Sequence, residues 1–325
     1  MVKTPRCGRP ADFRQQLAEA AAHIRATLLS KKDGRYFHPK IGLIIGSTLK
    51  RYSEQLTEPR SILQQDIPHV APGDTGERPG RLWQGRIGPE RVLMMDTRPH
   101  LADGWEPWET VVLPLAMASL GCNTFIIINK AGGLREKQQI GDLVLIADQI
   151  LGPGCDPLTG YHDPALTARF PLMNQVFCPN LRNHALSIAE QLGLTKERHR
   201  TNKGAVLEPR EPLVESGGIY AELPGPCHPT PSQITELPSC ATLFGFSTAH
   251  EAAALHAYGR VRLLAISAIT KVWSAAKPDV EPRLAKAERP EITRQSRLSL
   301  ERLLTAIITT PCPRPAPAST RTRRR

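Results

Sequence analysis

Two short segments carry side chains that could hold an oxyanion. Gly46–Lys50 (GSTLK) follows an apolar run, so its turn can present backbone N–H groups together with the Ser47 hydroxyl. Thr97–His100 (TRPH) spaces Arg98 and His100 two residues apart, which in an extended chain places both side chains on one side. Each segment alone also fits an ordinary turn after a strand, so each is weak evidence by itself.

Two further segments combine polar groups with glycine. In INKAGGLREKQQIGDLVLIADQIL, a predicted strand runs into an Asn-Lys-Ala-Gly-Gly turn and is followed by Gly-Asp and a second strand. The adjacent Gly132 and Gly133 indicate a tight backbone near a ligand. Gly245–Glu251 (GFSTAHE) sets Ser247 just before a predicted helix, where hydroxyls and unpaired N–H groups coincide.

The hydrophobic pattern predicts the elements that must position these groups. Short apolar runs bounded by turn residues predict strands at 41–46, 91–95, 124–128, 143–147, 205–207, 219–223 and 261–266. Apolar residues at helical spacing predict helices at 12–29, 108–120, 180–192, 232–237, 251–257 and 292–308. The alternation predicts one α/β domain built on a largely parallel or mixed sheet.

Charge and composition divide the chain into a body and two basic ends. The 325 residues are 40% hydrophobic and 22% charged, and no apolar run approaches the ~20 residues of a membrane span. The net charge of +11 resides mainly in the ends, which contain no acidic residue in 1–10 or 311–325. We expect a flexible basic leader (1–10), a domain (11–310) and a disordered Pro/Arg-rich tail (311–325). The tail is either a solvated end or a weak contact for nucleic acid or an anionic surface.

The seven cysteines argue against a metal centre. Their number is odd, their spacing is scattered, and none belongs to a CxxC or zinc-type cluster. Such cysteines are typical of reduced thiols, and the N-terminus lacks the apolar core of a secretory signal. These features predict a cytoplasmic protein without a structural metal.

Taken together and in chain order, the motifs resemble the trimeric, low-molecular-mass purine nucleoside phosphorylases. The matching segments include 41–49, PGRLWQGRIG, TRPHLADGWEPW, LGCNTFIIINKAGGL, GDLVLIADQILGPG, RFPLMN, LPGPCHPT, GFSTAHE and LLAISAIT. The resemblance implies a single α/β domain with a central mixed, barrel-like sheet flanked by helices, usually a homotrimer. It implies phosphorolysis of a purine nucleoside, with inorganic phosphate as co-substrate and no cofactor.

The resemblance also assigns a phosphate site. By position in the family's motifs, the phosphate-binding residues are Ser47, Arg98, His100, Lys130 (through its backbone) and Ser247. Arg78 stands where the family has a histidine, and it keeps the positive charge but cannot exchange a proton near neutral pH. Arg98 would supply charge-assisted hydrogen bonds to phosphate.

The nucleoside side departs from the family pattern. In Gly-Pro-Cys-His-Pro-Thr, Pro229 occupies the position of the purine-reading glutamate, and His228 replaces the aromatic residue that packs on the sugar. Phe246 replaces a methionine under the base. After the late strand, Thr270 is followed by Lys271 instead of the asparagine that binds purine N7.

Three functions therefore stay open. The first is a working phosphorylase with altered base specificity, in which His228, Phe246, Thr270 and Lys271 line the nucleoside pocket. The second is a degenerate, catalytically inactive member that acts as a binding or oligomeric scaffold protein. The third is a scaffold whose arginine-rich end makes the functional contact.

Overall fold

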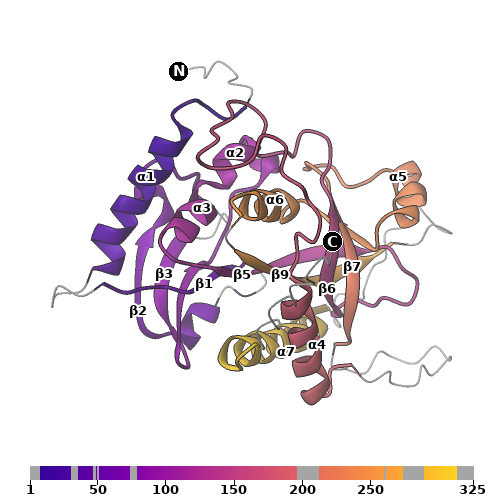
Figure 1. The fold of residues 1–325 in the computed structure, drawn as a ribbon. Helices are drawn as coiled ribbons and strands as arrows, with labels where there is room; N and C mark the ends of the chain where they lie inside the picture. Colours follow the sequence, from indigo (N-terminus) through magenta and orange to yellow (C-terminus); the bar gives the residue numbers. More distant parts are fainter. Residues whose placement is uncertain are drawn as a thin grey trace, which may run out of the picture.

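The strands that carry the predicted motifs lie in the centre of one mixed sheet (Figure 1). The computed structural model describes residues 8–30, 36–46, 49, 51–73, 79–195, 212–259, 261–273 and 289–312. Within them the strands are β1 (Ile41–Ile44), β2 (Thr57–Leu63), β3 (Arg81–Ile87), β4 (Glu90–Met95), β5 (Thr124–Gly133), β6 (Leu143–Ile150), β7 (Val214–Glu222), β8 (Leu243–Gly245) and β9 (Arg262–Val272).

Half of this sheet closes on itself. The strand order is β2-β3-β4-β1-β5-β8-β7-β6-β9, and β9 also pairs with β5, so the last five strands of this order form a barrel. Strand β5 runs parallel to β1 and β9, while β8 and β5 are antiparallel. The predicted single α/β domain with a mixed, barrel-like sheet is confirmed.

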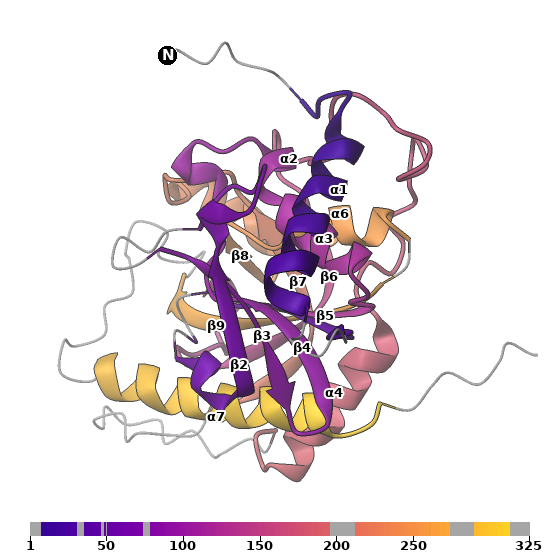
Figure 2. The same cartoon turned by 90° about the vertical axis from the view of Figure 1, so that its left-hand side faces the viewer.

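Helices cover both faces of the sheet (Figure 1, Figure 2). One apolar core joins the sheet to helices α1 (Phe13–Ile24), α3 (Val112–Ser119) and α6 (Ala249–Ala257). A second core joins the opposite face to α4 (Pro179–Gln191) and α7 (Arg289–Thr309). The short helices α2 (Pro107–Thr110) and α5 (Pro231–Glu236) lie at the periphery. Because the central strands are buried on both faces, they read in the sequence as continuous apolar runs.

The predicted elements are found, with specific differences. Strands β2, β3 and β8 were not predicted, and the helix expected at 108–120 is two helices that meet at Val111. The expected strand at 205–207 lies outside the described residues. The prediction of a turn at Asn-Lys-Ala-Gly-Gly is wrong, because residues 129–133 continue strand β5 and pair with β9. Gly132 is needed there because a Cβ would overlap the Phe244 ring.

The two ends of the domain are only partly described. Of the expected leader, residues 8–10 are described, and Arg9 is buried, with its Nε donating to the Tyr161 carbonyl at 3.0 Å. Residues 313–325 of the expected tail lie outside the described residues. In the described ranges, no helix is long and apolar enough to cross a membrane, and no cluster of His, Cys, Asp or Glu could hold a metal ion.

Candidate active site

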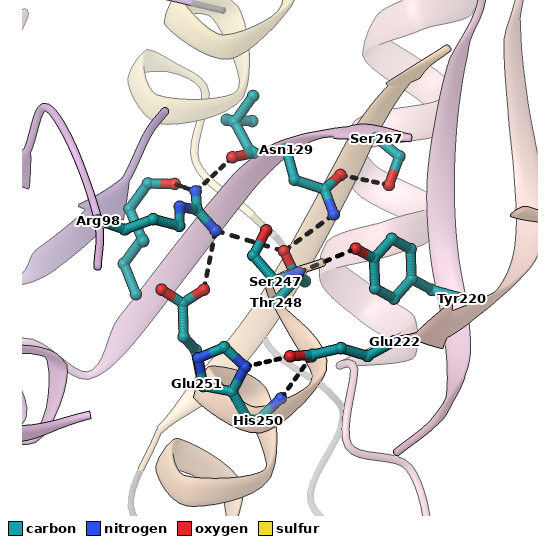
Figure 3. Close-up of polar contacts among 11 residues, drawn as sticks. Arg98, Asn129, Tyr220, Glu222, Ser247, Thr248, His250, Glu251 and Ser267 are labelled. Carbon is teal, nitrogen blue, oxygen red and sulfur yellow. Dashed lines mark hydrogen bonds and ion pairs between the residues drawn. The ribbon is translucent and has the colours of Figure 1, made fainter. Parts of the chain in front are cut away.

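Arg98 is the centre of a buried polar cluster at the ends of several strands (Figure 3). It follows strand β4, and the residue is only 3% exposed. Its Nη1 donates to Glu251 Oε2 at 2.8 Å and to Thr248 Oγ1 at 3.3 Å. Its Nη2 donates to the Ile44 carbonyl at 2.9 Å and to the Ile128 carbonyl. Arg98 thereby ties β1, β5 and α6 together.

The remaining donor of Arg98 is its Nε, which lies near Gly46. A guanidinium has five N–H groups, and the contacts at Nη1 and Nη2 engage four of them. A Cβ added at Gly46 would lie 3.9 Å from Arg98 Nε, so this nitrogen lies beside the start of the GSTLK segment. Ser47 itself lies outside the described residues, as does Arg78. The buried Glu251 carboxylate balances the charge of Arg98 in the absence of a ligand.

The Ser247–Thr248 turn is held in an unusual backbone conformation. Thr248 has φ +91°, a region that a β-branched residue rarely adopts and that requires support from its surroundings. Asn129 Nδ2 on β5 donates to Thr248 Oγ1 at 2.9 Å, and Ser267 on β9 donates to Asn129 Oδ1 at 2.5 Å. The Ser247 N–H donates to Tyr220 Oη at 3.4 Å. Three strands of the barrel thus fix the turn that contains Ser247.

A second buried ion pair adjoins the turn. The His250 N–H donates to Glu222 Oε2 at 2.9 Å, and the His250 ring Nδ1 contacts Glu222 Oε1. Both side chains are fully buried. Burial opposes a charge on the imidazole, but the Glu222 carboxylate outweighs it, and the pKa of His250 is raised. His250 therefore favours the charged imidazolium form.

His100 has the opposite electrostatic environment. Burial of the ring, followed by the positive charge of Arg98, lowers the pKa of His100. Its Nδ1 lies 3.5 Å from Asp103 Oδ2, and its side chain keeps 39% of its surface exposed. A lowered pKa keeps this imidazole neutral at pH 7, so it can donate one hydrogen bond to an anion and accept another.

Lys130 lies on β5 opposite Ala268 of β9, and its side chain is exposed. Its carbonyl oxygen lies close to Gly245, where an added Cβ would be 3.2 Å away. The assignment of its backbone to phosphate binding stays a prediction.

Aromatic residues gather at the predicted nucleoside side. The His228 ring lies 5.5 Å from the Phe246 ring, centroid to centroid, and 6.2 Å from the Trp273 ring. The His228 and Phe246 planes are inclined by 56°. The exposed His228 ring thus packs against the half-buried Phe246 ring.

Thr270 and Lys271 lie near the end of β9, where the pairing with β5 is irregular. Lys271 pairs with Gly132 of β5, and the register shifts between Ala131 and Gly132. The Thr270 hydroxyl donates to the Ala131 carbonyl at 3.3 Å. Pro229 is buried, so the position of the family's glutamate is filled by a packed ring that accepts no hydrogen bond.

The structure thus joins Arg98 and Ser247 in one cluster, sets His100 beside it, and joins His228 to Phe246. The residues that the sequence reasoning missed are Asn129, Tyr220, Glu222, Thr248, His250, Glu251, Ser267 and Trp273. One signal was present: α6 reads AHEAAALHA, and an alanine-rich, largely buried helix with two ionisable residues in its first turn requires buried partners.

Comparison with known proteins assigns this fold and site to a class. The sequence model of the phosphorylase superfamily matches residues 40–309. The chain therefore belongs to the phosphorylase superfamily and, within it, to the purine nucleoside phosphorylases. These proteins are enzymes of the glycosyltransferase type, and family membership supports phosphorylase activity at the level of the family.

Two relatives illustrate the match. Purine nucleoside phosphorylase 1 of Bacillus subtilis (strain 168) is 28% identical over 298 residues, covering 91% of this chain and 98% of the relative. The crystal structure of Schistosoma mansoni purine nucleoside phosphorylase in complex with adenosine superposes with a TM-score of 0.75 at 24% identity, covering 91% and 96% of the two chains. The same Schistosoma protein in complex with inosine gives a TM-score of 0.74 at 25% identity, with the same coverage.

Proposed function

We propose that the protein cleaves the N-glycosidic bond of a purine (2′-deoxy)ribonucleoside with inorganic phosphate. The products are the free base and (deoxy)ribose 1-phosphate, and the reaction uses no cofactor. The observation that carries this proposal is the Arg98 cluster, in which a buried guanidinium and the Ser247 turn converge beside the glycine loop after β1.

The proposed chemistry needs an anion held close to C1′ of the sugar. A phosphate oxygen forms the bond to C1′ while the bond from C1′ to the base nitrogen breaks, and the electron pair leaves with the base, which then takes up a proton. Arg98 Nε, the neutral His100 imidazole and the Ser247 hydroxyl are the described groups that we assign to phosphate. Ser47, Arg78 and the Lys130 backbone complete the proposed set. Fixed donors in a site shielded from water contribute most to such catalysis.

For the base, we propose a purine held by His228, Phe246, Thr270 and Lys271. Crystal structures of Schistosoma mansoni purine nucleoside phosphorylase in complex with adenosine and with inosine support a purine nucleoside as the substrate. Lys271 is a cation near the end of β9, two residues before Trp273. An ammonium group near the departing base would stabilise the negative charge that builds on it.

A catalytically inactive binding or scaffold protein is the second candidate. Two observations favour it: the His228 and Phe246 rings contact each other, and the buried Pro229 side chain offers no acceptor to a base. Such a protein would bind phosphate without releasing any base.

The deciding experiment is a chromatographic assay for free base. The full chain is incubated with inosine, guanosine, adenosine, xanthosine or methylthioadenosine, with and without phosphate. Phosphate-dependent release from any of them supports the proposal, and the preferred nucleoside identifies the base. A folded protein that binds phosphate but releases no base supports the second candidate.

We also propose a homotrimer in the cytoplasm. Support for self-association comes from the RFPLMN segment, where Phe170 is 84% and Leu172 79% exposed, an unusual exposure for large apolar side chains. Cys122, Cys155, Cys178, Cys227 and Cys240 are free thiols, which supports a reducing compartment. Contact of the arginine-rich tail with nucleic acid or an anionic surface stays a prediction for residues outside the described ranges.

A further inference from the structure

Two consecutive residues at the start of α6 belong to two different buried ion pairs. Glu251 pairs with Arg98, on the proposed phosphate side, at 2.8 Å. His250 pairs with Glu222, the last residue of β7. All of these side chains are at least nine-tenths buried, and Figure 3 shows the two pairs on opposite sides of the α6 start. The helix start is therefore anchored from two directions by charge.

Glu222 has a particular place in the chain. The residue after it, Leu223, begins the 223–230 loop, which carries His228 of the proposed nucleoside side. The Leu223 N–H donates to the Gly245 carbonyl at 2.8 Å, and Gly225 (φ +69°) packs against Phe246. The root of the loop therefore lies against the strand that leads into the Ser247–Thr248 turn.

The contact at Glu222 is made of two bonds to one residue. The His250 backbone N–H and ring Nδ1 both reach the Glu222 carboxylate, one oxygen each. Two bonds fix the orientation of the carboxylate as well as its position. The charged and titratable groups that act on His250 are Glu222 from β7, Glu251 from α6 itself, and Arg98 and His100 from the segment after β4.

We propose that His250 is a positioning residue that, through Glu222, fixes the nucleoside loop 223–230 relative to the phosphate turn Ser247–Thr248. The effect on turnover rests on the proposed function, whereas the effect on the loop does not. Removing the His250 imidazole leaves the buried Glu222 carboxylate without its counter-charge. The contact that joins the end of β7 to the start of α6 therefore weakens. The Glu251–Arg98 pair keeps the phosphate turn in place, so the loop moves and the turn does not.

The test compares His250→Gln, Glu222→Gln and the double variant with His184→Gln as the matched control. His184 lies on α4, outside the site, and its Nε2 contacts a backbone carbonyl, that of Thr310, at 3.1 Å instead of a carboxylate. Hydrogen exchange of the ligand-free full chain is followed in peptides covering 219–230 and 246–257. We expect amide exchange in 219–230 to rise about tenfold or more in each single variant. The control should match the parent.

The double variant provides the rescue. Two glutamine amides can hydrogen-bond to each other and to the residue 250 N–H without a buried charge, so exchange in 219–230 should return close to that of the parent. A purely structural loss would raise exchange in both peptides and throughout α6, without rescue. Unchanged exchange in 219–230 in the single variants, or a rise without rescue, overturns the proposal.

Kinetics separate this inference from the proposed function. In an active parent, His250→Gln should raise KM for the nucleoside about tenfold while KM for phosphate changes less than twofold. An equal rise in both constants contradicts the proposal. If the parent releases no base, the proposed function fails, and the exchange measurement alone decides whether His250 positions the loop.

Discussion

At the scale of single residues, Arg98 has a structural role in the cluster and is also assigned to phosphate binding. Its charge is already balanced by Glu251, and its terminal nitrogens are used by the protein. A phosphate that approaches Nε meets a donor whose position cannot relax, because four contacts hold it. Such preorganisation avoids the cost of reorienting the side chain when the ligand arrives. Sequence motifs identify the arginine, but they cannot show that the carboxylate beside it comes from α6.

The Arg98→Lys substitution tests this assignment. A lysine keeps the charge but cannot reach the set of acceptors that the planar guanidinium serves. We expect the free energy of unfolding to fall by about 2 kcal/mol, from lost hydrogen bonds to a charged group. Phosphate should raise the melting temperature of the parent and not of the variant.

Arg86→Lys is the control for Arg98→Lys, because Arg86 lies 3.8 Å from Glu58 in an exposed pair. Its melting temperature and its response to phosphate should equal those of the parent. A phosphate-induced shift in Arg98→Lys as large as that of the parent would contradict the assignment.

The pKa of His250 makes a second prediction at this scale. Because its pKa is raised in the folded protein, the stability it contributes is full below the unfolded value of about 6.5. That contribution is lost as the pH rises through the folded pKa. His100, whose pKa is lowered, acts on the acid side and reduces stability as the pH falls below about 6.5.

We therefore expect chemical denaturation to show stability falling from pH 6.5 upward in the parent. In His250→Gln the curve should be flat over the same range and lower below it. The acid-side loss from His100 should be slightly smaller in His250→Gln, because His250 contributes to the lowering of the His100 pKa. Parallel curves for parent and variant above pH 6.5 would refute the role of His250 in this dependence.

At the scale of elements, close approach of β8 to β7 shapes the phosphate turn. A Cβ at Gly245 would overlap the Tyr220 hydroxyl, which accepts the hydrogen bond from the Ser247 N–H. We expect Gly245→Ala to cost about 1–3 kcal/mol of unfolding free energy through overpacking. Because Tyr220 must move, phosphate binding measured by calorimetry should also weaken.

Gly42→Ala provides the matched comparison on β1. A Cβ there would overlap the Phe125 ring in the core, so a similar loss of stability is expected. Phosphate affinity should stay that of the parent, since Phe125 does not contact the turn. Equal weakening in both variants would mean that general destabilisation, and not Tyr220, controls phosphate binding.

The strands that the sequence predicted share one property, a run of residues buried on both faces of the sheet. β1, β4, β5 and β9 are continuous apolar runs and were recognised. β3 carries Arg81, Gln84 and Arg86 among its apolar residues, and β2 begins with exposed polar residues, so neither shows such a run. β8 is three residues long, too short for any periodicity. The alternation of strands and helices was therefore sufficient for the fold class but not for the outer strands.

The same limit applies to the site. Arg98, His100 and Ser247 lie in local motifs and could be predicted by resemblance. Glu222 and Glu251 are recognisable as site residues only when the strand order brings β7 and α6 to Arg98, contacts that span 28 to 153 residues in the chain. Trp273 joins the His228 and Phe246 rings because β9 ends beside β5 and β8, which periodicity along the sequence does not reveal.

At the scale of the whole molecule, α6 connects the site to the exposed apolar segment. Its start carries the two ion pairs, and near its end His256 contacts the Leu172 carbonyl at 3.0 Å through Nε2. The segment 169–173 is therefore held by this hydrogen bond to α6, the helix that supports the phosphate turn. If a second copy of the chain covers Phe170 and Leu172, assembly and the site share this helix.

Phe170→Asp tests whether that segment is an interface. A charge at the centre of a packed apolar contact is costly to desolvate, so we expect the variant to be monomeric by sedimentation while the parent is a trimer. Folding should be unaffected, because Phe170 is 84% exposed in the single chain. Tyr36→Asp is the control: Tyr36 is also exposed, at 51%, but forms a β-bridge with Ser30, and this variant should sediment like the parent. A parent that sediments as a monomer at micromolar concentration would remove the trimer. If Phe170→Asp still sediments as a trimer, the trimer interface lies elsewhere on the molecule. The exposed Phe170 and Leu172 side chains would then contact a different partner.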